Sequence, residues 1–222
     1  MSYEAGVAHV GSALSNVDII EATYRVKKEG EKFVLSNGHA AAALYAVLEK
    51  RGIIQKADIN ELGVHPERDT YIDIEVSTGS LGQGLPIAVG IAMANRDNKV
   101  YCCISDGECA EGSIWESLRI ASSFKLDNLK VIVNANKMAG YQEIDPELLI
   151  PMFQSFGCDV IDVDGHDVSE LVEAMTIKTD NPLVVFARTR VDQLPFLSGL
   201  DAHYHKISDE ELKIAQEIWP KD

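Results

Sequence analysis

An aspartate and an asparagine each follow an apolar run of this chain. Asp106 lies just after the run at 100–104, and Asn136 lies just after the run at 129–133. Residues 113–124 between the runs have helical spacing, so we expect both polar residues at the carboxyl edge of a parallel sheet, where ligands bind. Carboxylate, amide and backbone carbonyl oxygens suit a Mg²⁺ ion that also holds phosphate. The spacing indicates a metal-anchored diphosphate site, although Asp-Gly and Asn also occur in ordinary turns.

A glycine-rich segment precedes one of the predicted helices. Residues 77–84 read Ser-Thr-Gly-Ser-Leu-Gly-Gln-Gly and end where an apolar helix over 85–95 is expected. Glycines let a backbone approach a ligand closely, and a helix N-terminus offers free N–H groups to an anion. The segment is therefore compatible with phosphate binding, and a plain connection from strand to helix is the alternative.

Four of the six histidines fall in predicted loops or at the ends of predicted elements. Histidines at strand-to-helix junctions are compatible with one polar pocket for proton transfer or hydroxyl recognition. Separate surface positions are the alternative, because the sequence does not show that these residues converge. The four are His9, His39, His65 and His203, whereas His166 is expected in a turn and His205 is left unassigned.

Two glutamates follow the Asp106 turn. Glu111 begins the predicted helix, and Glu108 lies three residues before it. Acidic residues are favoured at helix N-termini by the helix dipole, so helix capping explains both residues without any catalytic role.

Composition and charge narrow the class of protein. The chain has 222 residues, enough for one α/β domain, and its formal charge of −15 argues against a nucleic acid or an anionic membrane as partner. The four cysteines lack zinc-site spacing, and core thiols in a reducing compartment are expected. We find no signal peptide and no apolar stretch of about 20 residues that could span a membrane. A cytoplasmic location is therefore expected.

Predicted helices and strands alternate along most of the chain. This order predicts an α/β fold, a three-layer α/β/α sandwich with a mostly parallel sheet, as a single domain over 1–222. The first long helix is expected at 17–28, with Ser15 or Asn16 as its N-cap, and residues 65–74 are expected to form a loop. Further helices are predicted at 40–51, 57–62, 85–95, 113–124, 145–156, 168–177 and 209–218, the last capped by Ser208, and strands at 33–35, 100–104, 129–133, 159–163 and 183–187.

Six segments, in order, resemble the N-terminal, diphosphate-binding part of transketolase. The most specific is 77–85, which is nearly identical to the family's Ser-Thr-Gly-Ser-Leu-Gly-Gln-Gly-Leu. Asp106-Gly107 with Asn136 resembles the thiamine diphosphate motif, Gly-Asp-Gly with a downstream Asn. The other segments are 8–15 (family Gly-His-Pro-Gly-Gly-Ser-Leu-Ser), 35–40 (Leu-Ser-Lys-Gly-His-Ala), 65–67 (within Gly-His-Pro-Glu) and 202–203 (Trp-His-Gly).

The resemblance implies a thiamine diphosphate-binding fold and a role for each matching residue. Asp106, Asn136 and the carbonyl of Met138 would hold Mg²⁺, or Ca²⁺ or Mn²⁺ in its place, on thiamine diphosphate. The four loop histidines would act as catalytic residues along the substrate channel. The residues implied to bind the cofactor are His39, Ser80, Leu81, Gly82, Asp106, Gly107, Glu108, Glu111 and Asn136, with Glu111 also at the subunit contact.

The family activates its cofactor with a glutamate from a pyrimidine-binding domain, and this sequence ends at Asp222 before any such domain. The resemblance therefore implies one subunit of a split transketolase, which with a partner chain carrying that domain would form an α2β2 heterotetramer. The reaction implied is transfer of a two-carbon ketol unit from a ketose or its phosphate to an aldose. Two alternatives stay open: another thiamine-dependent reaction, such as deoxy-ketose phosphate synthesis or 2-oxo acid conversion, and a non-catalytic subunit.

Several positions depart from the family pattern. Ser105 replaces the first glycine of Gly-Asp-Gly, and Val10 replaces a proline beside His9. Residues 62–65 are a much shorter connection than the family's substrate loop, and 188–192 replaces a Lys/Gly-rich turn. These changes suggest a donor or acceptor other than the common pentose and hexose phosphates.

Overall fold

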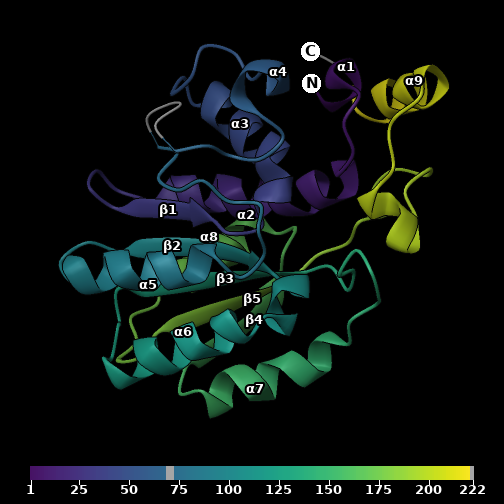
Figure 1. The fold of residues 1–222 in the computed structure, drawn as a ribbon. Coiled ribbons are helices and arrows are strands. Elements are labelled where there is room, and N and C mark those ends of the chain that lie inside the picture. Colours follow the sequence, from purple (N-terminus) through teal and green to yellow (C-terminus); the bar gives the residue numbers. More distant parts are fainter. Residues whose placement is uncertain (69–72, 221–222) are drawn as a thin grey trace.

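The computed structural model describes residues 1–68 and 73–220 and contains one parallel sheet between two layers of helices (Figure 1). The sheet order is β1-β2-β3-β5-β4, with every neighbouring pair parallel. The predicted α/β fold is confirmed. The strands are β1 (Lys32–Leu35), β2 (Val100–Ser105), β3 (Leu129–Ala135), β4 (Asp159–Asp164) and β5 (Leu183–Arg188).

Two hydrophobic clusters, one on each face of the sheet, hold the layers together. One contains residues of α2, α3 and α8, and the other contains residues of α5, α6 and α7. The neighbouring thiols of Cys103 and Cys102 enter these two clusters separately, as alternation along a strand requires. The helices are α1 (Ser2–Ala5), α2 (Val10–Val26), α3 (Ala41–Lys50), α4 (Ile59–Leu62), α5 (Gly84–Ala94), α6 (Gly112–Ser123), α7 (Leu149–Ser155), α8 (Val168–Thr176) and α9 (Asp209–Ile218).

The central strands β2 and β3 are buried along their whole length. Such continuous apolar runs are typical of parallel strands that are covered on both faces. Their register pairs Ser105 with Asn134, so both strands end at the same level of the sheet. The residues that follow them therefore emerge side by side at the carboxyl edge.

The first long helix differs from the prediction. It begins at Val10 instead of residue 17, and its N-cap is His9. Ser15 and Asn16, predicted as caps, lie inside the helix and are fully buried. Their side chains donate hydrogen bonds to the carbonyl of Ser12 instead of capping free N–H groups. Polar residues of this kind often mark a helix start, but here they face buried polar groups of the sheet.

Smaller differences lie at other element ends. The predicted helix at 145–156 is a 3₁₀ turn, Pro146–Leu148, followed by α7, and the helix predicted at 57–62 begins only at Ile59, after its N-cap Asp58. Ser208 does cap α9, in a reciprocal arrangement with Glu211. Part of the loop predicted at 65–74 lies outside the described residues.

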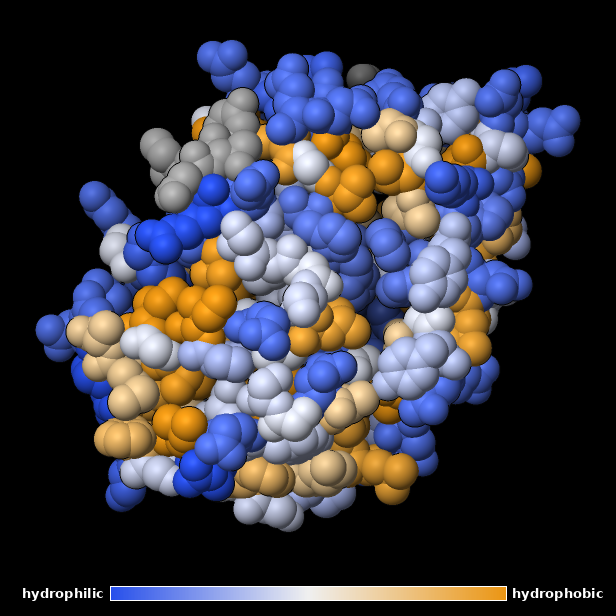
Figure 2. All heavy atoms as spheres, in the orientation of Figure 1, coloured by the Kyte–Doolittle hydropathy of each residue, from blue (hydrophilic) through white to orange (hydrophobic). Residues whose placement is uncertain are grey.

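The surface view shows apolar side chains gathered over α5 (Figure 2). Ile87 and Met93 of this helix are both more than 40% exposed. Within the described ranges, none of the helices combines the length and the apolar character that crossing a bilayer requires.

Candidate functional site

The structure brings Asp106 and the Asn136 turn into direct contact at the carboxyl edge. The backbone N–H of Lys137 donates to Asp106 Oδ2 at 2.6 Å, and the N–H of Gly107 donates to Asp106 Oδ1 at 2.8 Å. A carboxylate offers about four acceptor sites, so both oxygens keep capacity for a further partner. The predicted proximity of these two residues is therefore observed.

Burial makes the charged form of the Asp106 carboxylate energetically costly. Its side chain is fully buried, and burial raises the pKa of Asp106 to about 7, while hydrogen bonds from backbone N–H groups oppose the rise. Among the described residues, no basic side chain forms an ion pair with it. A buried carboxylate without a counter-charge is costly unless a cation or hydrogen bonds offset the lost hydration. A divalent cation would provide that compensation.

The turn after β3 is held in an unusual backbone conformation. Lys137 has φ of 70°, which is uncommon for a residue other than glycine and stores strain of order 1–3 kcal/mol. Asn136 Oδ1 accepts the N–H of Met138 at 2.9 Å, and Met138 then bridges to Glu143 across the loop. This conformation aims the Lys137 N–H at Asp106 and leaves the Asn136 oxygen with one acceptor site.

These donors fit a hard divalent ion. One carboxylate, one amide oxygen and a backbone carbonyl match the oxygen ligands of Mg²⁺, which keeps waters and phosphate oxygens as its other ligands. Nowhere in 1–68 or 73–220 do three His, Cys, Asp or Glu side chains cluster as a metal site. The proposed donor set contains a single carboxylate and does not require such a cluster.

The four predicted histidines converge on the same edge. The ring centroid of His9 lies 5.5 Å from that of His39, 6.4 Å from that of His65 and 4.6 Å from that of His203. The His203 ring also contacts Tyr204, at 4.7 Å. The alternative of scattered surface positions is therefore wrong, whereas the catalytic roles of these residues stay a prediction.

A cavity of about 250 Å³ lies among these rings and opens beside the Asn136 turn. Asp106 does not line it, and its carboxylate accepts the N–H groups of Gly107 and Lys137 beside the cavity. The cavity is lined by the four histidines together with Gly79, Leu81, Ser105, Gly107, Asn136, Met138, Ala139, Tyr141 and Tyr204.

Two glycines make room for the imidazoles. A Cβ on Gly79 would lie 2.7 Å from the His65 ring, and one on Gly140 would lie 3.2 Å from the His203 ring. Gly79 and Gly140 also have positive φ, which disfavours other residues. Gly79, the first glycine of the 77–84 segment, therefore leaves space for the His65 ring.

Burial keeps the inner histidines neutral. It lowers the pKa of His39 to about 3 and that of His9 to about 4, and repulsion from neighbouring imidazoles, that of His203 first, adds to the effect. Burial also lowers the pKa of His203. A neutral imidazole carries one N–H donor and one acceptor nitrogen, so each ring can donate one hydrogen bond and accept another.

Glu108 has a different role from the helix cap considered for it. Its carboxylate is fully buried and accepts hydrogen bonds from Ser36 Oγ at 2.6 Å, Gly82 N at 2.9 Å and Ser105 N at 3.0 Å. It thereby joins the ends of β1 and β2 to the glycine-rich segment. Burial raises the pKa of Glu108, and the three donors oppose that rise.

The other predicted cofactor residues are distributed unevenly. Leu81 lines the cavity. Gly82 does not line it, and its backbone N–H donates to the Glu108 carboxylate. Ser80 and Glu111 are exposed and do not line the cavity. Glu111 is the N-cap residue of α6, but its side chain makes no capping hydrogen bond.

Sequence reasoning missed a buried polar layer beneath the site. Asn134 and Asn136 both donate side-chain hydrogen bonds to Ser15 Oγ, and the Thr189 hydroxyl donates to Asn134 Oδ1. Asn37 similarly donates to Asn16 at 3.0 Å. The available signal was the presence of polar residues within otherwise apolar strand and helix segments, since buried polar groups need partners.

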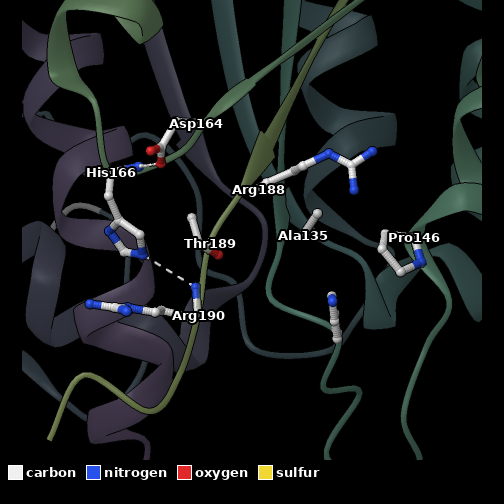
Figure 3. A pocket seen from close by; sticks show the side chains of 8 residues that line it. Ala135, Pro146, Asp164, His166, Arg188, Thr189 and Arg190 are labelled. Atoms are coloured by element: carbon white, nitrogen blue, oxygen red, sulfur yellow. Dashed lines mark hydrogen bonds between the residues drawn. The ribbon is translucent and has the colours of Figure 1, made fainter.

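A second cavity, of about 640 Å³, lies at the ends of β3, β4 and β5 (Figure 3). His166 closes one wall, where its Nε2 accepts the backbone N–H of Arg190 at 3.2 Å and its Nδ1 contacts Asp18 at 3.0 Å. Arg188 extends on the opposite side and pairs with Asp162 and Glu147. Thr189 stands between these walls and connects this cavity to the polar layer.

Comparison with known proteins places these features in a family context. Residues 4–222 match the family model described as transketolase, thiamine diphosphate binding domain. The chain is 35% identical to the transketolase of Homo sapiens, over 83% of this chain and 34% of that protein. It is 34% identical to the 6-deoxy-6-sulfo-D-fructose transketolase subunit SqwG of Clostridium sp., over 96% of this chain and 86% of that subunit.

A solved structure agrees with this match. The transketolase of Campylobacter jejuni aligns with a TM-score of 0.85 and 29% identity, over 97% of this chain and 39% of that one. The chain spans about a third of the length of the curated full-length transketolases it matches.

Removing the Glu108 carboxylate should loosen the glycine-rich segment. We expect Glu108→Ala to lower the free energy of unfolding by roughly 3 kcal/mol, because buried donors lose their shared acceptor. Glu108→Gln should cost less, because it keeps the volume and one acceptor oxygen. Urea unfolding measures both variants, with exposed Glu116→Gln as the control within about 0.5 kcal/mol. A loss for Glu108→Ala no larger than the control's would contradict this role.

The histidine cluster should make stability depend on pH. The folded-state pKa values of His9 and His39 lie below the unfolded value of about 6.5, so the unfolded chain binds more protons between that pH and about 4. The stabilisation is present above pH 6.5 and is lost as the pH falls toward 4. The raised pKa values of Asp106 and Glu108 act in the opposite direction over the same range, so the comparison between variants carries the test. In chemical unfolding at pH 7 and at lower pH, His39→Asn should lose less stability than the wild type. An equally steep profile for that variant would refute the assignment.

Proposed function

The chain belongs to the transketolase family, as a thiamine diphosphate-binding domain, and from this premise we propose that it is the diphosphate-binding subunit of a split transketolase. The reaction proposed is transfer of a two-carbon ketol unit from a ketose or ketose phosphate to an aldose. The observation that carries the proposal is the convergence of the Asp106–Asn136 contact and the four histidines on one edge of the sheet.

The cofactor would be held by groups from several segments. Asp106, Asn136 and the Met138 carbonyl would bind Mg²⁺, or Ca²⁺ or Mn²⁺ in its place, and Gly107 would let the backbone approach the diphosphate. A Cβ on Gly107 would lie 3.0 Å from the Cα of Ala139, so a larger residue would press against the loop that follows Asn136. When bound, thiamine diphosphate would supply the electron-sink chemistry that cleavage of a ketose C–C bond requires.

The histidines would handle protons and hydroxyl groups of the sugar. His9 Nδ1 is buried without a hydrogen-bond partner among the described residues, and it lies next to the rings of His39 and His203. A neutral imidazole there would accept a proton from a ketose hydroxyl as the C–C bond breaks, and would return one to the acceptor carbonyl oxygen. The exposed His65 would bind sugar hydroxyls at the mouth of the cavity.

The proposal includes a partner chain with the pyrimidine-binding domain. The match to SqwG, a protein named as a subunit, over 86% of its length supports this arrangement. The partner would supply the activating glutamate, and an α2β2 assembly in the cytoplasm follows by family analogy.

Thiamine diphosphate binding with Mg²⁺ tests this function directly. Calorimetry on the chain mixed with its partner subunit should show binding, and Asp106→Asn should weaken it by about 100-fold or more, since even outer-shell changes cost about 10–100-fold. Ketol transfer by the mixture should fall in parallel.

Asp97→Asn provides a matched control, because it makes the same chemical change at an exposed position away from the site. It should bind the cofactor like the wild type. The proposal fails if the wild-type mixture binds no cofactor, or if Asp106→Asn binds as tightly as the control.

A further inference from the structure

We propose that Ser15 is a positioning residue that determines which way the Asn136 amide faces, so that the oxygen and not the nitrogen is presented to the metal. The inference rests on the proposed function, because it concerns the metal ligand of that site. Ser15 lies in the second turn of α2 and is fully buried. It is separated from Asn136 by 121 positions in the sequence, and only the tertiary structure brings the two together.

The Ser15 hydroxyl donates one hydrogen bond and accepts two, which defines its donor and acceptor roles. Its single proton is donated to the carbonyl of Ser12 at 3.0 Å, and that carbonyl also accepts the Asn16 side chain at 2.7 Å. A carbonyl oxygen only accepts, so the Ser15 hydroxyl is the donor in this contact. While this bond is kept, Ser15 Oγ offers only its lone pairs to other groups.

Two asparagine amides use those lone pairs. Asn134 Nδ2 donates to Ser15 Oγ at 2.9 Å, and Asn136 Nδ2 donates to the same atom at 3.3 Å. An asparagine side chain can exchange its oxygen and nitrogen by a half-turn, and hydrogen-bond partners decide which orientation holds. An oxygen facing the Ser15 lone pairs would be repelled, so both amides must present their NH₂ groups to it.

The opposite end of the Asn136 amide is matched as well. Its Oδ1 accepts the N–H of Met138 at 2.9 Å, on the side where the turn contacts Asp106. A flipped amide would set NH₂ against that N–H and would present two donors to the cation. Ser15, which accepts from the NH₂ group, and Met138, whose N–H donates to the oxygen, thus hold the amide in one orientation.

Asn134 is fixed from another strand. The Thr189 hydroxyl, just after β5, donates to Asn134 Oδ1, which keeps the Asn134 NH₂ group on Ser15. Thr189 also lines the larger cavity of Figure 3. Every link from Thr189 through Asn134 and Ser15 to Asn136 pairs one donor with one acceptor, as a buried polar network requires.

The test measures metal affinity in the assembled complex of this chain with its partner subunit. Mn²⁺ serves as the probe, and its binding in the presence of thiamine diphosphate is followed by electron paramagnetic resonance. We expect Ser15→Ala to weaken Mn²⁺ binding by about 10–100-fold, the usual range for a residue that orients a ligand. Thermal unfolding is recorded on the same samples.

Thr23→Val is the matched control for loss of a buried hydroxyl. Thr23 lies in the same helix, is fully buried and donates to the carbonyl of Ile19 at 2.8 Å, but its other contact is with Met175, away from the site. This variant should lower stability without changing Mn²⁺ affinity. Ser15→Cys, which keeps the volume but offers only a weak acceptor, should reproduce the affinity loss if Ser15→Ala does not fold.

A second background separates positioning from packing. An aspartate at 136 presents an oxygen whichever way it turns, so Ser15→Ala should cost little Mn²⁺ affinity when combined with Asn136→Asp. Equal losses in both backgrounds, or wild-type affinity in Ser15→Ala, would overturn the role of Ser15 while leaving the proposed function intact. Absence of Mn²⁺ binding in the wild-type complex would overturn the proposed function and this inference together.

Discussion

The parallel pairing of β2 with β3 up to Ser105 and Asn134 is the constraint on which the site depends. Because both strands end at one level, the next residues of each must turn over the same edge, and the Lys137 N–H reaches the Asp106 carboxylate at 2.6 Å. A shift in this register would separate the two proposed metal ligands. The apolar strands thus matter for function because the level at which they end determines where Asp106 and Asn136 lie.

The same edge concentrates polar groups that an apolar core would ordinarily exclude. Asp106 and Glu108 are fully buried carboxylates only two positions apart, yet they are treated differently. Glu108 is satisfied by three donors from this chain, which makes it a structural tie between loops. Asp106 accepts hydrogen bonds from backbone N–H groups and retains acceptor capacity, as expected of a carboxylate that binds a cation.

The histidine cavity depends on backbone conformations and close contacts that most residues disfavour. His9 has φ of 69° at the start of α2. Its backbone N–H donates to the His203 carbonyl at 3.2 Å, which links the residue before α2 to the segment before α9. Gly79 and Gly140 leave space for the rings of His65 and His203. Segments that are remote in sequence therefore build one pocket. His9 is the N-cap residue of α2, and His39 and His203 lie in short 3₁₀ helices, Gly38–Ala40 and Gly199–His203.

The sequence by itself determined the five strands, the parallel α/β class and the family, because apolar runs and spaced motifs are local signals. It also indicated Asp106 and Asn136, whose positions after two strands predict a shared edge. It indicated four histidines as well, but only the structure shows that they converge. Only the tertiary structure decided that Ser15 and Asn16 lie inside α2, that Glu108 is a buried tie, and that Ser15 meets Asn136. Hydrogen-bond partners of buried groups come from distant segments, and local patterns do not encode which segments those are.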